Sequence, residues 1–79
     1  MEKIYLLLKK LNKIKIKLNG KYIKIKDNIT LFSLIKKTKV PINKVAIELN
    51  QVVINKKSLS RIKIKKNNKI EIVHFIGGG

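Results

Sequence analysis

The chain contains a strict alternation of lysine and aliphatic residues over residues 13–18. The three aliphatic residues of this segment fall on one side of an extended backbone and the lysines fall on the other, which is typical of a half-buried strand. Asn19-Gly20 follows, and this dipeptide supplies the two positive φ angles of a type I′ turn. Because the alternation resumes over residues 22–26, the sequence predicts a β-hairpin.

A two-residue loop also fixes which residues of the hairpin face each other. It places Ile16 opposite Ile23, and it places Lys15 opposite Lys24. Two like charges in directly opposite positions cost roughly a few tenths of a kcal/mol. We therefore expect the lysine face of the hairpin to be exposed, where water and salt screen this repulsion.

A helix is predicted directly after the hairpin, where Asp27-Asn28 ends the second strand. Thr30 is suited to be its N-cap, and four residues follow at helical spacing, namely Leu31, Leu34, Ile35 and Thr38. Pro41 marks the end, because the residue before a proline is pushed out of helical geometry.

The rest of the chain reads as short strands separated by turns. The expected elements are a strand at 45–49, a short strand at 52–54, a turn or single helical turn at 56–61, a further alternating segment at 62–65, a turn at Asn67-Asn68 and a last strand at 70–75. A hairpin, a helix and further strands in this order predict an α+β domain.

Residues 1–13 are predicted to be an N-terminal extension of unknown role. Ile4, Leu7, Leu8 and Leu11 have the spacing of an amphipathic helix, whereas residues 4–8 also suit an edge strand, and a lysine-bearing helix can rest on a membrane surface. The apolar run is too short for a signal peptide or a membrane span. We expect a cytoplasmic protein, or one of an organelle stroma if the genome is that of a plastid.

The formal net charge of +16 has two interpretations. It favours nucleic acid or an anionic membrane as a partner, but all the basic residues except Arg61 are lysines, and lysine, isoleucine and asparagine have adenine- and thymine-rich codons. A dedicated nucleic-acid binder is expected to use arginine and more aromatic platforms than Tyr5, Tyr22, Phe32 and Phe75. Codon usage is the favoured interpretation, and a basic nucleic-acid-binding module is the rival.

Equipment for catalysis is sparse in this sequence. There is no cysteine, His74 is the only histidine, and the four acidic residues are scattered along the chain. Gly20 is the only glycine before the tail, which excludes a P-loop or a dinucleotide fingerprint. We therefore expect no catalytic residue, no metal site and no bound cofactor, and the chain is not expected to be an enzyme.

The last three residues are the exception, because they hold three of the four glycines. A run of residues without Cβ can thread a narrow channel and present a terminal carboxylate deep inside another protein. The alternatives are a frayed terminus and a cloning remnant.

The most specific stretch is residues 70–79, IEIVHFIGGG, which joins a strand directly to the glycine end. It accompanies the turn Leu18-Asn19-Gly20, the helix start Thr30-Leu31, and the run VAIELN with Val53-Ile54 after it. With these features, residues 14–79 resemble the ThiS family, the sulfur carriers of thiamine thiazole synthesis. The resemblance implies a ubiquitin-like β-grasp fold, a mixed sheet of four to five strands packed on one main helix, over residues 14–76, with residues 77–79 as a flexible carrier tail.

The resemblance also implies a mechanism. In the family, a partner uses MgATP to adenylate the terminal glycine carboxylate, and sulfur then replaces AMP to give a thiocarboxylate. Gly79 would be the site of adenylation and of a C-terminal 1-thioglycine modification, and Gly77 and Gly78 would thread partner active sites. The implied partners are an E1-like adenylating enzyme of the ThiF type, a cysteine-desulfurase sulfur donor system and a thiazole synthase of the ThiG type.

The sequence departs from the family pattern in three respects. Such carriers often have an Asp-Gly-Asp turn before the last strand, where this chain has Lys66-Asn67-Asn68, although Asn67 can still take the left-handed conformation. Asn55-Lys56 and Leu59 stand where Pro-Arg and an aromatic residue are common. The net charge is also far more positive than is expected of the family.

Alternation in the last strand predicts a docking surface. If Ile70 and Ile72 face the helix, Val73 and Phe75 face the open side of the sheet. We expect Val73, Phe75 and Ile76 to contact the adenylating enzyme. Molybdopterin-type carriers and ubiquitin-related modifiers share the fold and the glycine end, so those pathways, and conjugation to lysines, remain alternatives.

Overall fold

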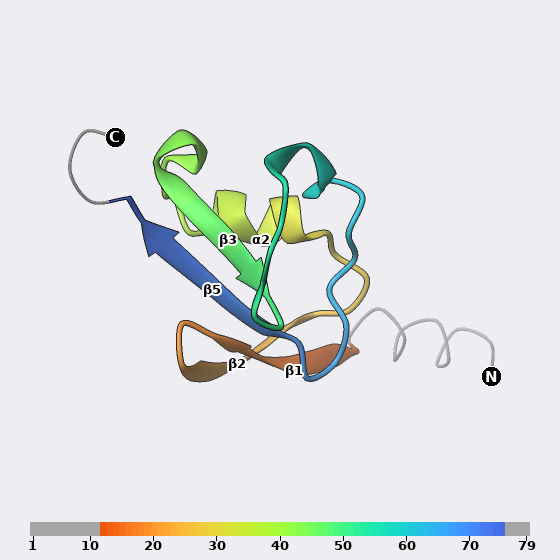
Figure 1. The fold of residues 1–79 in the computed structure, drawn as a ribbon. Coiled ribbons are helices and arrows are strands. Elements are labelled where there is room, and N and C mark those ends of the chain that lie inside the picture. The colour runs from red at the N-terminus through yellow and green to blue at the C-terminus, as the bar shows by residue number, and fades with distance from the viewer. Residues whose placement is uncertain (1–11, 76–79) are drawn as a thin grey trace, which may run out of the picture.

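The computed structural model describes residues 12–75 as a five-stranded mixed sheet with an α-helix packed on one face (Figure 1). The strands are β1 (Lys13–Leu18), β2 (Lys21–Lys26), β3 (Val45–Leu49), β4 (Val52–Val53) and β5 (Lys69–His74). They lie in the order β2-β1-β5-β3-β4, with β1 and β5 parallel and the other neighbours antiparallel. This arrangement confirms the predicted α+β, β-grasp fold.

The β1–β2 hairpin has the predicted turn and register. Asn19 has a φ angle of 49° and Gly20 one of 82°, the two positive values that the type I′ turn requires. Ile16 lies opposite Ile23, and Lys15 lies opposite Lys24. Both lysines are exposed, as the repulsion between them led us to expect.

Helix α2 (Leu31–Lys37) begins at the predicted cap. The Oγ1 atom of Thr30 accepts a hydrogen bond from the backbone N–H of Ser33 at 3.1 Å. The helix ends at Thr38, whose backbone N–H donates to carbonyls of the last turn, and Lys39 then takes a positive φ angle of 62°. The chain therefore leaves the helix before it reaches Pro41.

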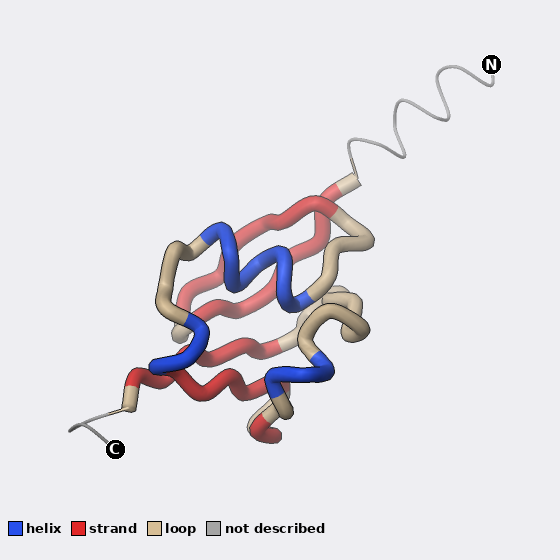
Figure 2. The backbone as a smooth tube through the Cα atoms, turned by 90° about the horizontal axis from the view of Figure 1, so that it is seen from above, coloured by secondary structure: helices blue, strands red, loops and turns tan. Residues whose placement is uncertain are grey.

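The core lies between α2 and one face of the sheet, and Figure 2 shows the helix crossing over the strands. Its buried residues come from every part of the fold: Ile16, Leu31, Leu34, Ile35, Val45, Ile47, Leu59, Ile64 and Ile70. Each such side chain contributes about 1.5–3 kcal/mol when it is fully buried. The opposite face of the sheet carries no helix within residues 12–75, and it is called the open face below.

Three segments differ from the elements expected from the sequence or add detail to them. Residues 62–65 form only an isolated bridge between Thr30 and Lys63, because their backbone partners are the loop residues just before α2, and that loop turns into the helix at once. The turn at 56–61 contains a short 3₁₀ helix, η2 (Lys56–Ser58), which agrees with the expected helical turn. A second one, η1 (Ile42–Lys44), precedes β3 and was not predicted.

The expectations for residues 1–11 and 76–79 lie outside the described residues. Among residues 12–75, no helix is both long and apolar enough to cross a membrane.

Candidate functional site

Strand β5 is the element that leads to the glycine end, and it lies in the middle of the sheet (Figure 1). It pairs with β1 through Lys69 and Ile70 on one side, and with β3 from Ile70 to His74 on the other. The backbone remains held one residue past the strand, because the N–H of Phe75 donates to the carbonyl of Lys44 at 3.0 Å. The backbone that leads to the glycine end is therefore held in place as far as Phe75. Ile76, Gly77, Gly78 and Gly79 lie outside the described residues.

The side chains of β5 alternate as predicted. Ile70 is fully buried and Ile72 packs against the core, whereas Val73 and Phe75 are 44% and 58% exposed. Ala46 of β3 lies directly opposite Val73 and faces the same side. Ala46, Val73 and Phe75 form an apolar patch on the open face, on the part of β5 that leads to the tail.

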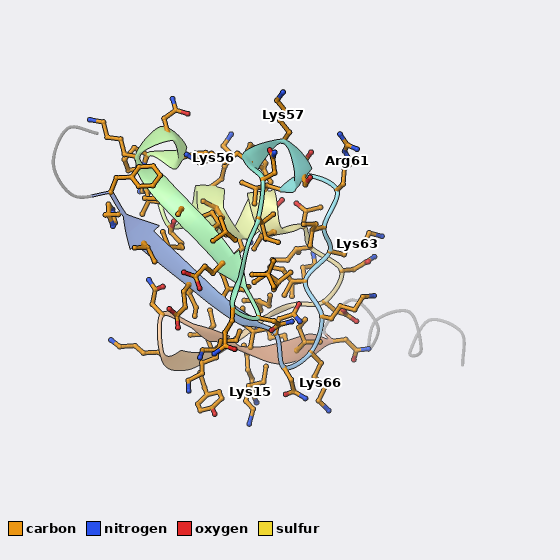
Figure 3. All side chains as sticks on the ribbon, in the orientation of Figure 1. Lys15, Lys56, Lys57, Arg61, Lys63 and Lys66 are labelled. Carbon is orange, nitrogen blue, oxygen red and sulfur yellow. The ribbon has the colours of Figure 1, made fainter. Side chains whose placement is uncertain are left out.

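A cation borders this apolar patch. The Nζ atom of Lys56 lies 5.3 Å from the centroid of the Phe75 ring. Lys56 comes from η2, and Figure 3 shows it near the end of β5. Attraction between an ammonium group and an aromatic face is worth about 0.5–1 kcal/mol at an exposed site, so it helps to orient the ring.

Two glutamates occupy neighbouring positions in the middle of the open face, and this was not predicted from the sequence. Glu48 of β3 lies directly opposite Glu71 of β5. Glu71 also forms an ion pair with Lys69, with 3.8 Å between Oε1 and Nζ and both side chains about 40% exposed. The residues looked scattered because they are far apart in sequence, and only the β3–β5 register brings them together.

A pocket of about 270 Å³ lies farther along the open face, toward the hairpin. Lys15, Ile16, Lys17, Tyr22, Asn67 and Lys69 line it, and it is called the basic pocket below. The Nζ atoms of Lys15 and Lys17 lie 5.1 Å and 5.3 Å from the centroid of the Tyr22 ring. The sequence analysis did not identify this pocket, because it depends on the parallel pairing of β1 with β5.

His74 lies at the end of β5 and is exposed, as expected for a strand residue that faces solvent or a partner. In the part of the chain that the structure describes, no group of three or more His, Cys, Asp or Glu side chains could hold a metal ion. The open face carries three surfaces suited to recognition: an apolar patch at the end of β5, a pair of carboxylates and a basic pocket.

A sequence model of the ThiS family matches residues 10–79 of the chain. The chain belongs to the ThiS family. The match includes the whole glycine end, and at the other end it begins at residue 10. It covers every strand of the sheet.

Two further proteins are similar to this member of the ThiS family. A thiazole synthase of Magnetococcus marinus is 35% identical over 65 residues, which are 82% of this chain and 20% of the synthase. The chain thus spans about a fifth of that relative. The crystal structure of the thiamine biosynthesis protein ThiS from Geobacter metallireducens superposes with a TM-score of 0.75 at 25% identity, covering 84% of this chain and all of that protein. These matches support a sulfur-carrier role in thiamine biosynthesis.

The structure accounts for the departures from the ThiS pattern. Asn67 has a φ angle of 68°, so the turn before β5 forms without glycine. Asn55 caps η2 by accepting a hydrogen bond from the N–H of Lys57 at 2.9 Å. Leu59 is 1% exposed and fills the core. These replacements keep the fold that positions β5.

Proposed function

We propose that this chain is a sulfur carrier for thiazole synthesis and that the C-terminal carboxylate of Gly79 carries the sulfur. An adenylating partner of the ThiF type joins this carboxylate to the AMP part of MgATP and releases pyrophosphate. The terminal sulfur of a persulfide from a cysteine-desulfurase system then attacks the acyl carbonyl and releases AMP. A thiol reductant cleaves the S–S bond of the resulting acyl disulfide and leaves a thiocarboxylate, the 1-thioglycine form of Gly79. A thiazole synthase of the ThiG type accepts the sulfur.

The observation that carries this proposal is the family match, which runs through the last strand to residue 79. The structure supports it, because β5 pairs with β1 at its start and with β3 as far as His74, and its backbone is held as far as Phe75. A tail without side chains mounted on such a strand suits delivery of a carboxylate into another protein's active site.

The chemistry divides naturally between the chain and its partners. A carboxylate oxygen is a poor leaving group, and adenylation joins it to AMP, so that it leaves readily as part of AMP. The sequence has no P-loop, so the groups that handle phosphate belong to the partner. The chain then acts as a co-substrate, and it needs no catalytic residue of its own.

The relative from Magnetococcus marinus favours a thiazole synthase as the acceptor. A segment similar to this chain forms part of that synthase polypeptide. Two functions that share one polypeptide in a relative are expected to work together when they are separate chains. This observation favours thiazole synthesis over molybdopterin synthesis and over a ubiquitin-related modifier.

The apolar patch is the proposed contact with the adenylating enzyme. Val73 and Phe75 are exposed on the strand that leads to the tail, and Ile76 follows them in sequence. An aromatic side chain that becomes desolvated at the centre of an interface often contributes much of the binding energy. An enzyme that draws in the tail would cover these residues first.

Removal of Gly78 and Gly79 tests the proposed function. We expect ATP–pyrophosphate exchange by the adenylating enzyme to require the full chain and to be lost with the truncated one, while thermal unfolding of the two is the same. Exchange that survives the truncation contradicts the proposal. RNA binding indifferent to the truncation, together with absent exchange by the full chain, favours a nucleic-acid-binding module, and covalent conjugates to lysines favour a modifier.

A further inference from the structure

The basic pocket concentrates three ammonium groups on the open face. Lys15 and Lys17 come from β1, and Lys69 comes from the start of β5. In the register of β1 with β5, Lys17 lies directly beside Lys69, and Lys15 lies opposite Lys24 on the other side. Like charges in such positions repel one another, and a negative group in the pocket would relieve this repulsion.

Little within residues 12–75 compensates these charges. The contact between Lys69 and Glu71 is the only ion pair within residues 12–75, and it is long and half exposed. Lys15 and Lys17 contact the Tyr22 ring instead, which is 67% exposed. In water, solvent and salt screen the three ammonium groups, and covering the pocket removes that screening.

The basic pocket lies within reach of the surface proposed to dock the adenylating enzyme. Lys69, Glu71, Val73 and Phe75 alternate along one face of β5, and six residues of a strand span roughly 20 Å. A standard protein interface buries about 800 Å² on each partner, which corresponds to a patch roughly 30 Å across. An interface of this size is large enough to cover Val73, Phe75 and the pocket together.

We propose that the basic pocket binds an acidic segment of the adenylating enzyme, with a carboxylate seated among Lys15, Lys17 and Lys69. The inference rests on the proposed function, because it concerns the enzyme that activates Gly79. Covering ammonium groups without a negative partner is unfavourable, and opposing carboxylates offset this cost. A pocket of about 270 Å³ accommodates one or two carboxylate side chains.

The open face accordingly predicts which chemical groups the enzyme places against it. An apolar area meets Val73 and Phe75, a cation meets the paired carboxylates of Glu48 and Glu71, and an acidic area meets the basic pocket. A phosphate backbone fits this face less well, because Glu48 and Glu71 interrupt the basic surface between the pocket and the apolar patch. An acidic protein segment is therefore favoured over nucleic acid as the occupant.

The test compares two pairs of substitutions with the same change in charge. Lys15→Gln with Lys17→Gln removes two charges from the pocket, and Lys36→Gln with Lys37→Gln removes two exposed charges from α2, on the other side of the sheet. Binding of each full chain to the adenylating enzyme is measured by calorimetry, and activation is measured as kcat and KM for the carrier. Both measurements are repeated over a range of salt concentrations.

We expect the pocket pair to weaken binding and kcat/KM by about tenfold or more at low salt, through KM, and to flatten the salt dependence. For the α2 pair, binding and kcat/KM should stay within roughly twofold of the values for the unaltered chain, since distant charges are screened. The kcat at saturating carrier should be unchanged, because the tail is intact. Unfolding in urea should show that both variants are folded.

Several outcomes overturn the inference. Equal losses in the two pairs mean that total charge acts without a specific pocket, and no loss in the pocket pair means that the enzyme does not cover it. Loss of RNA binding or of thiazole synthase binding, with adenylating-enzyme binding retained, assigns the pocket to another occupant. If the enzyme binds the unaltered chain without activating it, the proposed function fails, while the binding data still decide the role of the pocket.

Discussion

The side-chain oxygen of Asn19 accepts a hydrogen bond from the backbone N–H of Ile72 at 2.7 Å, between residues 53 positions apart. The backbone N–H of Asn19 donates to the carbonyl of Ile70 at 2.9 Å. A residue of the hairpin turn therefore continues the hydrogen bonds between β1 and β5 past the end of β1. The strand that leads to the tail is held by the turn as well as by its neighbouring strands.

Asn19 has two roles, because it forms the hairpin turn and its side chain accepts a hydrogen bond from β5. Replacing Asn19 with glycine separates these two roles. Glycine accepts the φ angle of 49°, so the turn should form, but the acceptor for the Ile72 N–H is lost. We expect Asn19→Gly to lower the free energy of unfolding in urea by about 1 kcal/mol. Amide hydrogen exchange at Ile72 should become faster, while Asn19→Asp, which keeps the acceptor, should preserve protection. Equal protection in all three proteins would refute this role.

The cap of α2 gives a second prediction about stability. The Oγ1 atom of Thr30 accepts a hydrogen bond from the N–H of Ser33, one of the donors without a partner inside the helix. Thr30→Ala should lower the free energy of unfolding by about 1 kcal/mol. Thr30→Ser keeps a hydroxyl acceptor and should retain most of the stabilisation that the cap provides. A Thr30→Ala variant as stable as the unaltered chain would show that the cap contributes nothing measurable.

The opposed lysines of the hairpin give a prediction about charge. Lys24→Glu replaces the repulsion with Lys15 by an attraction across β1 and β2. We expect it to raise the free energy of unfolding by roughly 0.2–1 kcal/mol at low salt, and this gain should vanish near 1 M salt. Lys57→Glu, at an exposed position outside the sheet, makes the same change in net charge. An equal gain in that variant would attribute the effect to total charge.

The apolar patch gives a prediction about activation. Phe75→Glu should lower kcat/KM for adenylation by roughly tenfold or more, because it places a charge where an aromatic side chain is proposed to be desolvated. Phe32→Glu is the matched control, since Phe32 is 36% exposed on α2, away from the open face. Unchanged adenylation with Phe75→Glu would remove the apolar patch from the interface.

Local signals in the sequence predicted the hairpin and the helix. Asn19-Gly20 determines both the turn and the register of the hairpin. Thr30 marks the start of α2 through a hydrogen bond to a residue only three positions away. The alternation of β5 correctly separated buried Ile70 from exposed Val73 and Phe75. Each of these features depends on residues that are close together along the chain.

Features that depend on pairing between distant segments could not be predicted in the same way. Alternation at 62–65 looked like a strand, but the available partner is a loop that enters α2 after a single bridge. The pairing of Glu48 with Glu71 depends on the β3–β5 register, and the basic pocket depends on the β1–β5 register. The roles of Gly77, Gly78 and Gly79 stay predictions from the sequence and the family, because these residues lie outside the described part of the chain.

Intact-mass analysis tests the central proposal most directly. The protein is isolated with its native C-terminus after incubation with the adenylating enzyme, MgATP and the sulfur donor system, and a chain lacking Gly78 and Gly79 is treated in parallel. We predict that one oxygen atom of the full chain is replaced by sulfur, that fragmentation places the sulfur on Gly79, and that the truncated chain is unchanged. A full chain whose mass stays that of the free acid, or sulfur found elsewhere in the chain, would contradict the proposal.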